Sequence, residues 1–567
     1  DPDGSTRVIE FREMVQSLNE TGLRVVMDVV YNHTNASGQS PNSVLDRIVP
    51  GYYHRLDDAG VVETSTCCAN TATEHEMMER LMVDSLVTWA VEYKVDAFRF
   101  DLMGHHSLAN MQAVRDALDA LTIAEHGVDG SEIYLYGEGW NFGEVADDAR
   151  FVQATQLNLG GTGIGSFSDR LRDAVRGGGP FDGGDTLVSN QGFINGLYYD
   201  PNDMNSGSDD ELAKLLLSQD QIRVGLAGNL AAFEFVAADG TLIRGDEVDY
   251  NGSPAGYTDD PQENIIYVSA HDNQTLFDIS QYKHDNTVAM ADRVRAQNVG
   301  IDVTLLSQGV PFLHAGVDML RSKSMDRDSY NSGDWFNVLD FTYEDNNWGV
   351  GLPVAGKNQD NWYLMAPLLA DPDLDPGMDD ILASVEHTQE MLEIRDSTPL
   401  FRLTTAVDVQ DRVGFHNTGP AQLPGLIVMS IDDSTTGVDL DEEADAMWTL
   451  FNANDEEQQF TVADLVGEEV ELHPVQVASA DPIVQTASFD PGTGTFTVPA
   501  RTTAVFIELG PDTTPPTVMA SLLPEKVKKR TGWFEVWYAC SDDRDPAPVS
   551  YAELNGIPVP LGSRVYL

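Results

Sequence analysis

Apolar runs of strand length alternate with longer helical patterns over residues 8–316, and this alternation is typical of βαβ units around a parallel sheet. A strand buried on both faces of such a sheet needs nearly continuous apolar sequence. The runs that meet this need lie at 24–31, 95–101, 133–138, 163–167, 264–270 and 310–316. A closed (β/α)8 barrel has eight strands, so the pattern predicts an α/β fold with about six strands of a TIM-type barrel.

Helical patterns separate the predicted strands. One helix is predicted over 7–19, before the first strand, and another over 74–94, before the second. In the second helix, five positions recur at spacings of three and four, which predicts that they share one buried face. They are Met78, Leu81, Met82, Ser85 and Trp89.

The pattern changes after residue 316. A loop rich in Asp, Asn, Gly and Pro precedes a predicted helix at 381–395, and short alternating strands with turns then indicate an antiparallel β-sandwich. The run PDTTPP is typical of a stiff linker. The predicted segments are a partial (β/α)8 barrel at 1–398 that begins before its third strand, a β-sandwich at 399–510, a linker at 511–516 and the start of an incomplete Ig-like β module at 517–567.

The charge balance excludes one class of partner. The chain has 92 acidic and 33 basic residues, which gives a net charge of −59 at pH 7. Phosphate backbones would be repelled by this charge, whereas a neutral polysaccharide would not, so we expect no nucleic-acid partner. No apolar run has the length that a transmembrane helix needs. Nothing in the sequence indicates an oligomeric state.

Polar residues gather where the predicted strands end. In a (β/α)8 barrel the active site lies at the carboxyl ends of the strands. Four ends carry polar residues, in the segments DVVYNH (28–33), FRFD (98–101), YGEGW (136–140) and SAHDN (269–273). Arg99 lies two residues before Asp101 and therefore on the same face of its strand, where it can hold that carboxylate in the ionised form.

These residue types fit glycoside hydrolysis with retention of configuration. That reaction needs a carboxylate nucleophile and a carboxylic acid on neighbouring positions around the scissile bond. Asp101 and Glu138 end neighbouring strands, so we predict Asp101 as the nucleophile and Glu138 as the general acid and base. We expect the pKa of Glu138 to be raised by the carboxylates of Asp101 and Asp272. Asp272 would stabilise the positively charged transition state.

The same segments supply candidate substrate-binding residues. His33 and His271 would donate hydrogen bonds to hydroxyl groups of the sugar, with Arg99 and Asn273 beside them. Trp140 offers an aromatic face for a neighbouring glucose, although a core position is the alternative for this residue. We assign no metal ligand to the site.

The four segments resemble the conserved regions of the α-amylase superfamily of glycoside hydrolases, and the finer resemblance is to type I pullulanases and limit dextrinases. It rests on YNHTNASG, GYYHRL, ETSTCCANTATEH, KVDAFRFDLMGHH, YGEGWNFGE, GTGIGSFSDRLRDAVRGGGPF, HDNQTLFD and RSKSMDRDSYNSGDWFN, and it covers about residues 1–510. The resemblance implies the roles given above for Asp101, Glu138 and Asp272, with His33, Arg99 and His271 around the sugar at the cleaved bond.

The resemblance implies an endo-acting hydrolase that cleaves α-1,6 branch linkages in pullulan, limit dextrins and starch or glycogen. An amylase acting on α-1,4 linkages, or an isoamylase-like debranching enzyme, would share the same carboxylates. A non-catalytic glucan-binding scaffold would lack at least one of the three, and all are present. In that family the first two barrel strands and further domains precede the region matched here, so we expect this chain to be a fragment.

Further expectations concern cofactors and location. The hydrolysis requires no cofactor, while the acidic stretches LADPDLDPGMDD and DLDEEADA could bind Ca²⁺ or be solvated surface. The Pro-rich linker and the β module after it suggest a large modular protein that acts outside the cytoplasm on polymers too large to import, so we expect a secreted or cell-surface enzyme. Arg321, Lys323, Arg327 and Asp328 would either shape the glucan subsites or lie in a solvated loop. Cys67 and Cys68 would form a vicinal disulfide or be two reduced neighbours.

Overall fold

The computed structural model falls into two compact units, Asp1–Glu508 and Leu509–Leu567, which are described separately. The described residues are 4–435, 437–441, 444–510, 517–523, 533–541, 552–554, 557–559, 561 and 564–566.

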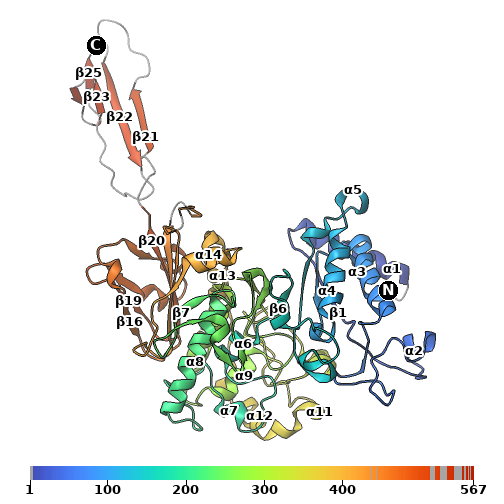
Figure 1. Ribbon diagram of the computed structural model, residues 1–567. Coiled ribbons are helices and arrows are strands. Elements are labelled where there is room, and N and C mark those ends of the chain that lie inside the picture. Colours follow the sequence, from blue (N-terminus) through green and yellow to red (C-terminus); the bar gives the residue numbers. More distant parts are fainter. Residues whose placement is uncertain are drawn as a thin grey trace. The chain divides into compact units, whose positions relative to one another are not determined.

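The first unit contains a six-stranded parallel sheet, of which Figure 1 labels β1 and β6. Its order is β1-β4-β5-β6-β11-β12, with β1 and β12 at the two edges. The strands are β1 (Val26–Val29), β4 (Ala97–Phe100), β5 (Tyr134–Gly137), β6 (Gly165–Phe167), β11 (Asn264–Ile266) and β12 (Val310–Pro311). The parallel sheet and its six strands confirm the prediction from apolar runs. The observed strands are shorter than predicted; β11, for example, ends at Ile266, whereas the predicted strand continued to residue 270.

Three helices share a hydrophobic cluster with the first half of this sheet. α1 (Gly4–Glu20), α3 (Glu76–Tyr93) and α4 (Leu108–Asp119) pack with β4 and β5 in one hydrophobic cluster. In α3 the buried positions follow a strict spacing of four: Met78, Met82, Leu86 and Ala90. The predicted face was therefore wrong at Leu81, whose exposed fraction is 43%, because the stripe runs through Leu86 instead.

Seven more helices follow between β6 and the antiparallel sheets. They are α6 (Asp169–Arg176), α8 (Asp209–Leu226), α9 (Leu276–Lys283), α10 (Met290–Leu305), α12 (Trp362–Leu369), α13 (Met378–Ser397) and α14 (Ala406–Arg412). The helix predicted at 381–395 corresponds to α13, which packs against α10. Shorter helices and hairpins occupy the loops: α2 (Leu45–Ile48), α5 (Ile123–His126), α7 (Thr186–Ser189), α11 (Ala355–Asn358), β2 (His33–Thr34), β3 (Ala69–Asn70), β7 (Glu234–Val236), β8 (Leu242–Arg244), β9 (Asp249–Tyr250) and β10 (Ser253–Pro254).

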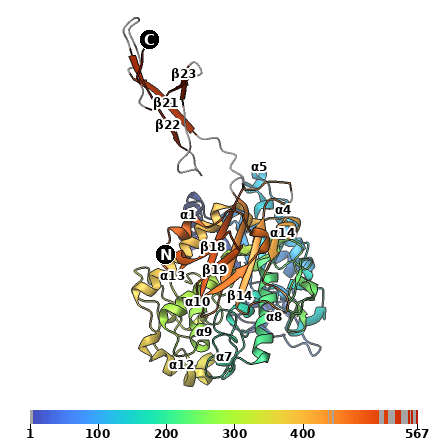
Figure 2. The ribbon, with the colours of Figure 1, turned by 90° about the vertical axis from the view of Figure 1, so that its left-hand side faces the viewer.

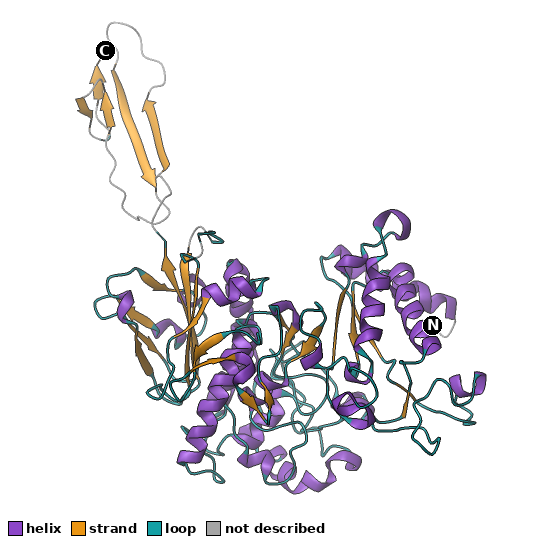
Figure 3. Cartoon of the chain, in the orientation of Figure 1, coloured by secondary structure: helices purple, strands orange, loops and turns teal. Residues whose placement is uncertain are grey.

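Two antiparallel sheets follow the helices (Figure 3). The larger has the order β13-β14-β15-β20-β17, with β13 (Val413–Phe415), β14 (Leu426–Asp432), β15 (Ala444–Asn452), β20 (Thr502–Leu509) and β17 (Val470–Leu472). The smaller joins β16 (Gln458–Thr461), β19 (Thr495–Val498) and β18 (Ser488–Asp490); α15 (Pro474–Val477) follows β17. Phe496 of the smaller sheet and Phe506 of the larger belong to the same hydrophobic cluster, as expected of packed antiparallel sheets.

Strand β14 contributes to two cores because its side chains alternate between the faces of the sheet. Leu426 and Val428 belong to the cluster shared with the smaller sheet. Ile427, Met429 and Ile431 belong to the cluster that contains residues of α10 and α13. Figure 2 labels β14, α10 and α13. The antiparallel and parallel parts of the first unit therefore share one continuous interior.

The second unit is all-β in its described residues. β21 (Thr517–Leu523), β22 (Trp533–Ser541) and β25 (Arg564–Tyr566) form one antiparallel sheet, and β23 (Ala552–Leu554) pairs with β24 (Ile557–Val559). The predicted linker at 511–516 lies outside the described residues. The segment boundaries and the Ig-like character of this module stay predictions.

Leu86 and Leu81 on α3 provide a matched test of this packing. Leu86→Ala should destabilise the protein by about 2–5 kcal/mol because it leaves a cavity in a fully buried site. Leu81→Ala should change the stability by no more than about 0.5 kcal/mol because its side chain is exposed. Urea unfolding followed by fluorescence measures both, and equal losses would contradict the observed helix face.

Candidate active site

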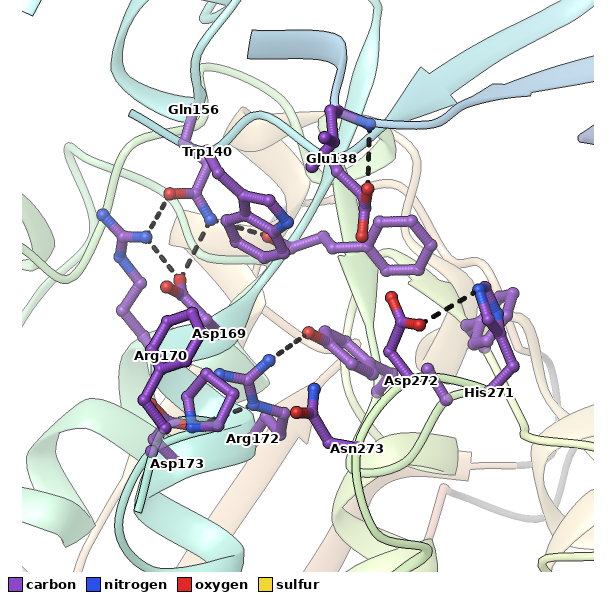
Figure 4. A pocket seen from close by; sticks show the side chains of 18 of the residues that line it. Glu138, Trp140, Gln156, Asp169, Arg170, Arg172, Asp173, His271, Asp272 and Asn273 are labelled. Atoms are coloured by element: carbon purple, nitrogen blue, oxygen red, sulfur yellow. Dashed lines mark hydrogen bonds and ion pairs between the residues drawn. The ribbon is translucent and has the colours of Figure 1, made fainter. Parts of the chain in front are cut away.

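A cavity of about 1460 Å³ lies where the parallel strands end. Its wall includes residues that follow β5, β6, β11 and β12, as the position of active sites at carboxyl strand ends predicts. Figure 4 shows the side chains of Glu138 and Asp272 projecting into the same space, with Trp140 nearby. Six predicted site residues line the cavity: Arg99, Glu138, Trp140, His271, Asp272 and Asn273.

Arg99 connects the carboxylates on three strands or strand ends. Its Nη1 lies 2.8 Å from Asp28 Oδ1 and 3.5 Å from Asp101 Oδ1, and its Nη2 lies 3.1 Å from Glu138 Oε1. Burial opposes the charge, but the three carboxylates outweigh it and raise the pKa of Arg99 above its usual range. The predicted contact between Arg99 and Asp101 is thus present, while Asp28, at the shortest distance, was not among the predicted site residues.

Glu138 is the most shielded of the candidate acids. Its side chain is 11% exposed, and the backbone N–H of Leu102 donates a hydrogen bond of 2.8 Å to Oε2. Burial, opposed by Arg99 and assisted by the charges of Asp101 and Asp272, raises the pKa of Glu138 to about 7. The direction agrees with our prediction, but burial contributes more than the neighbouring carboxylates.

Asp101 contacts Arg99 of the cavity wall, and His33 lies next to Asp101. Neither Asp101 nor His33 is among the residues that line the cavity. His33 Nδ1 lies 4.0 Å from Asp101 Oδ2, and Asp101 is 23% exposed. Asp101 N–H continues the β1–β4 ladder by donating to Val29 O, so the nucleophile candidate is fixed at the end of its strand. The guanidinium group of Arg99 contacts both Asp101 and Glu138 and so links the two acids.

His271, Asp272 and Asn273 lie on the loop after β11. The side chains of His271 and Asp272 are each 58% exposed, and His271 Nε2 lies 3.7 Å from Asp272 Oδ1. Asn273 has a φ of 60°, a left-handed conformation that Asn tolerates better than most residues. All three side chains line the cavity, and the exposure of His271 and Asp272 leaves them accessible to a ligand.

Lys323 donates a hydrogen bond to the backbone of this loop. Its Nζ donates 2.8 Å to His271 O, and its backbone N–H donates 2.8 Å to Asp278 Oδ2. Burial lowers the pKa of Lys323 to about 8. The sequence left open whether Arg321, Lys323, Arg327 and Asp328 shape the subsites or lie in a solvated loop. In the structure Lys323 is buried, Arg327 and Asp328 line the cavity, and Arg321 donates a hydrogen bond to His314.

One wall was missed by sequence reasoning. Helix α6 places charged side chains in the cavity wall: Asp169, Arg170, Arg172, Asp173 and Arg176. Arg172 donates 2.6 Å to the hydroxyl of Tyr267, and Arg170 packs over the rings of Tyr250 and Tyr257. The available signal was the density of arginines in a short helix whose residues are nearly all buried.

Close clusters of potential metal ligands are rare in the part of the chain that the structure describes. The one group found there with ligand atoms close together is His33, Cys67 and Cys68. His105 and His106 are buried, and burial lowers their pKa values to about 4 and about 3. Calcium binding by the acidic stretches stays a prediction, and residues 442 and 443 of the second stretch lie outside the described residues.

Comparison with known proteins decides the family. Residues 343–509 match the family model "Alpha-1,6-glucosidases, pullulanase-type, C-terminal". The chain is 52% identical over 516 residues to the chloroplastic pullulanase 1 of Arabidopsis thaliana, covering 90% of this chain and 53% of the relative. It is 44% identical over 509 residues to a Klebsiella pneumoniae pullulanase, covering 89% of this chain and 45% of that protein.

The fold agrees with this match. A crystal structure of a maltotriose complex of the K. pneumoniae pullulanase PulA superimposes with a TM-score of 0.85 at 43% identity, over 91% of this chain and 54% of that one. The chain belongs to the pullulanase family. It spans about half the length of the curated pullulanases that it matches.

The relatives of this pullulanase-family chain include chloroplastic and bacterial proteins. Among the described residues, no helix is both long enough and apolar enough to traverse a lipid bilayer.

The shifted pKa of Glu138 predicts a pH-dependent stability. Between about pH 4.5 and about pH 7 the folded chain keeps the proton that the unfolded chain loses, so Glu138 lowers the stability as the pH rises through this window. Glu138→Gln cannot titrate, and its stability relative to wild type should increase by roughly 1–3 kcal/mol from pH 4 to pH 8. Urea unfolding at a series of pH values measures this difference.

Glu132→Gln is the matched control because that side chain is 69% exposed. Because its ion pair with Arg24 is exposed to solvent, the stability of this variant relative to wild type should change less with pH than that of Glu138→Gln. Equal pH dependence of the two variants would contradict the proposed protonation of Glu138.

Proposed function

We propose that this chain carries the catalytic site of a retaining, endo-acting glycoside hydrolase that cleaves α-1,6-glucosidic branch linkages in pullulan, limit dextrins and starch or glycogen. The observation that carries the proposal is the buried Arg99 in contact with both Asp101 and Glu138 at the edge of a large cavity. The two acids end neighbouring strands and differ in environment, which is the arrangement that a nucleophile and a general acid need.

In the proposed first step, a carboxylate oxygen of Asp101 attacks the anomeric carbon while Glu138 donates its proton to the departing glycosidic oxygen. A pKa of about 7 lets Glu138 hold this proton near neutral pH. A covalent glycosyl-enzyme results. In the second step, Glu138 takes a proton from water, and the resulting attack on the anomeric carbon releases Asp101 with retained configuration.

The other residues act on the sugar and its charge. Asp272 lies on the cavity wall opposite Glu138 and would stabilise the positive charge that develops on the ring. His33, Arg99, His271 and Asn273 would bind hydroxyl groups, and Trp140 would stack on a neighbouring glucose. The hydrolysis consumes only water and substrate, so we expect no cofactor requirement.

The choice of linkage and polymer rests on the relatives. The two relatives described above are named pullulanases, and the solved structure holds maltotriose, the trisaccharide repeat of pullulan. An α-1,4-acting amylase or an isoamylase-like enzyme would use the same acids, so product analysis must distinguish them. A non-catalytic scaffold is disfavoured by the complete set of carboxylates.

Two finer features complete the proposal. We infer that the six-stranded sheet belongs to a (β/α)8 barrel, since its strands are all parallel and alternate with helices. We further infer that the enzyme acts on external polymer as a secreted or cell-surface protein, because branched glucans of this size do not cross membranes.

Asp101→Asn tests the nucleophile. The amide is not a competent nucleophile at this position, so turnover of pullulan should fall by at least about a thousandfold, with little change in the unfolding midpoint. Asp84→Asn, an exposed position on α3, should retain wild-type turnover. Reducing-sugar release measures both variants, and unaltered turnover in Asp101→Asn would refute this mechanism.

The linkage assignment is tested by products from pullulan. Cleavage of α-1,6 bonds between the repeats should release maltotriose as the main trisaccharide. Chromatography against standards identifies it. Trisaccharides that retain an α-1,6 bond would instead assign the enzyme to α-1,4 hydrolysis, with the catalytic carboxylates unchanged.

A further inference from the structure

A vicinal disulfide lies directly behind one of the candidate substrate-binding residues. Cys67 and Cys68 are bonded to each other immediately before β3, and β3 pairs with β2 so that Asn70 lies opposite His33. Cys67 Sγ is 3.5 Å from His33 Nε2. The two nitrogens of His33 therefore face different groups, with Nε2 toward the sulfur pair and Nδ1 toward Asp101, at 4.0 Å.

We propose that, once the disulfide is reduced, Cys67, Cys68 and His33 Nε2 form a three-ligand site for a thiophilic divalent cation of the zinc class. Nothing in the glycosidase mechanism uses these sulfur atoms. Two thiolates and one imidazole are a ligand set that Zn²⁺ and Cd²⁺ favour, and three protein ligands leave one coordination position for water.

The distances suit such a site. Zn–S bonds of about 2.3 Å and Zn–N bonds of about 2.0–2.1 Å at a tetrahedral angle place sulfur and nitrogen about 3.5 Å apart. The separation of Cys67 Sγ and His33 Nε2 already has this value. All three candidate ligand atoms lie within 4.8 Å of one another.

Hydrogen bonds that do not involve the disulfide hold residues 65–70 in place. Asn70 Nδ2 donates 3.0 Å to Glu144 Oε1, Ser65 Oγ donates to Glu144 Oε2, and Thr66 Oγ1 donates to Asn70 Oδ1. Burial opposes the charge of Glu144, but hydrogen bonds from Arg55, Ser65 and Asn70 outweigh it and lower the pKa of Glu144 to about 2. This fixed carboxylate would hold the thiols beside His33 after reduction.

The reduction and binding steps balance. A dithiol reductant supplies two electrons and two protons, the S–S bond breaks, two S–H groups form and the reductant closes to its own disulfide. The cation then displaces the two thiol protons and binds Nε2 of the neutral imidazole. Cys67 is exposed and Cys68 partly exposed, so a reductant and a hydrated cation can reach the sulfur atoms.

Occupation of the site would inhibit the enzyme, and this consequence alone rests on the proposed function. The cation would occupy His33 Nε2 and fix the ring, so that this nitrogen could no longer donate to a sugar hydroxyl. It would also place a positive charge close to the proposed nucleophile and weaken its attack.

Titration of the chain with Cd²⁺, after dithiol reduction and removal of the reductant under anaerobic conditions, tests the binding. Ultraviolet absorption from thiolate-to-metal charge transfer reports only cadmium bound to sulfur, which separates it from cadmium on the many surface carboxylates. Molar salt should be present to screen the net charge of −59. We expect saturation at one Cd²⁺ per reduced chain and no such absorption in the disulfide form.

Variants locate the ligands. The double variant Cys67→Ser/Cys68→Ser should lose the absorption, and His33→Ala should weaken the affinity at least about tenfold. Cys540→Ser, which removes the third cysteine of the chain, is the matched control and should bind as wild type does. Equal absorption in the disulfide form or in the double variant would overturn the site, and so would the absence of absorption in the reduced wild type.

The inhibition has a separate readout. Zn²⁺ should lower the turnover of the reduced enzyme at least about tenfold, and each variant is compared with itself with and without Zn²⁺. In the disulfide form and in the double variant, Zn²⁺ should leave the turnover unchanged. Cadmium binding with unchanged turnover would overturn the inhibition and leave the site standing, whereas an inactive but cadmium-binding chain would point to failure of the proposed function instead.

Discussion

The site depends on one buried guanidinium. Arg99 is almost without contact with water, and an unpaired charge in such a place would cost several kcal/mol. Contacts with Asp28, Asp101 and Glu138 compensate it. The strand register makes these contacts unavoidable, since Asp28 lies opposite Arg99 on β1 and Glu138 directly follows β5 on the other side. The charged cluster and the sheet therefore stabilise the same arrangement.

Besides Arg99, hydrogen bonds to the backbone fix the segments that carry the acids. Leu102 N–H holds Glu138 from the end of β4, and Lys323 holds the carbonyl of His271 beside Asp272. Each acid is thus positioned by a different segment of the chain. Their environments differ in burial, and the deep burial of Glu138 is the main reason that its pKa is raised to about 7.

The sequence was most informative where backbone periodicity dictates the answer. The parallel strands and the contact between Arg99 and Asp101 follow from apolar runs and from the two-residue repeat of a strand. Spacings of three and four allow more than one stripe on a helix, so Leu81 was predicted in place of Leu86. The cavity wall on α6 escaped prediction because burial of Arg172 depends on Tyr267, which lies 95 residues away. The same holds for Lys323, whose partner His271 belongs to another loop.

The alternation of side chains along β14 couples the parts of the first unit during unfolding. The strand seals the interior of the antiparallel sheets with one face and covers α10 and α13 with the other. Peeling the antiparallel sheets away would expose apolar side chains on both partners at once, which water disfavours strongly. The parallel sheet that carries the active site and the antiparallel sheets should therefore unfold together.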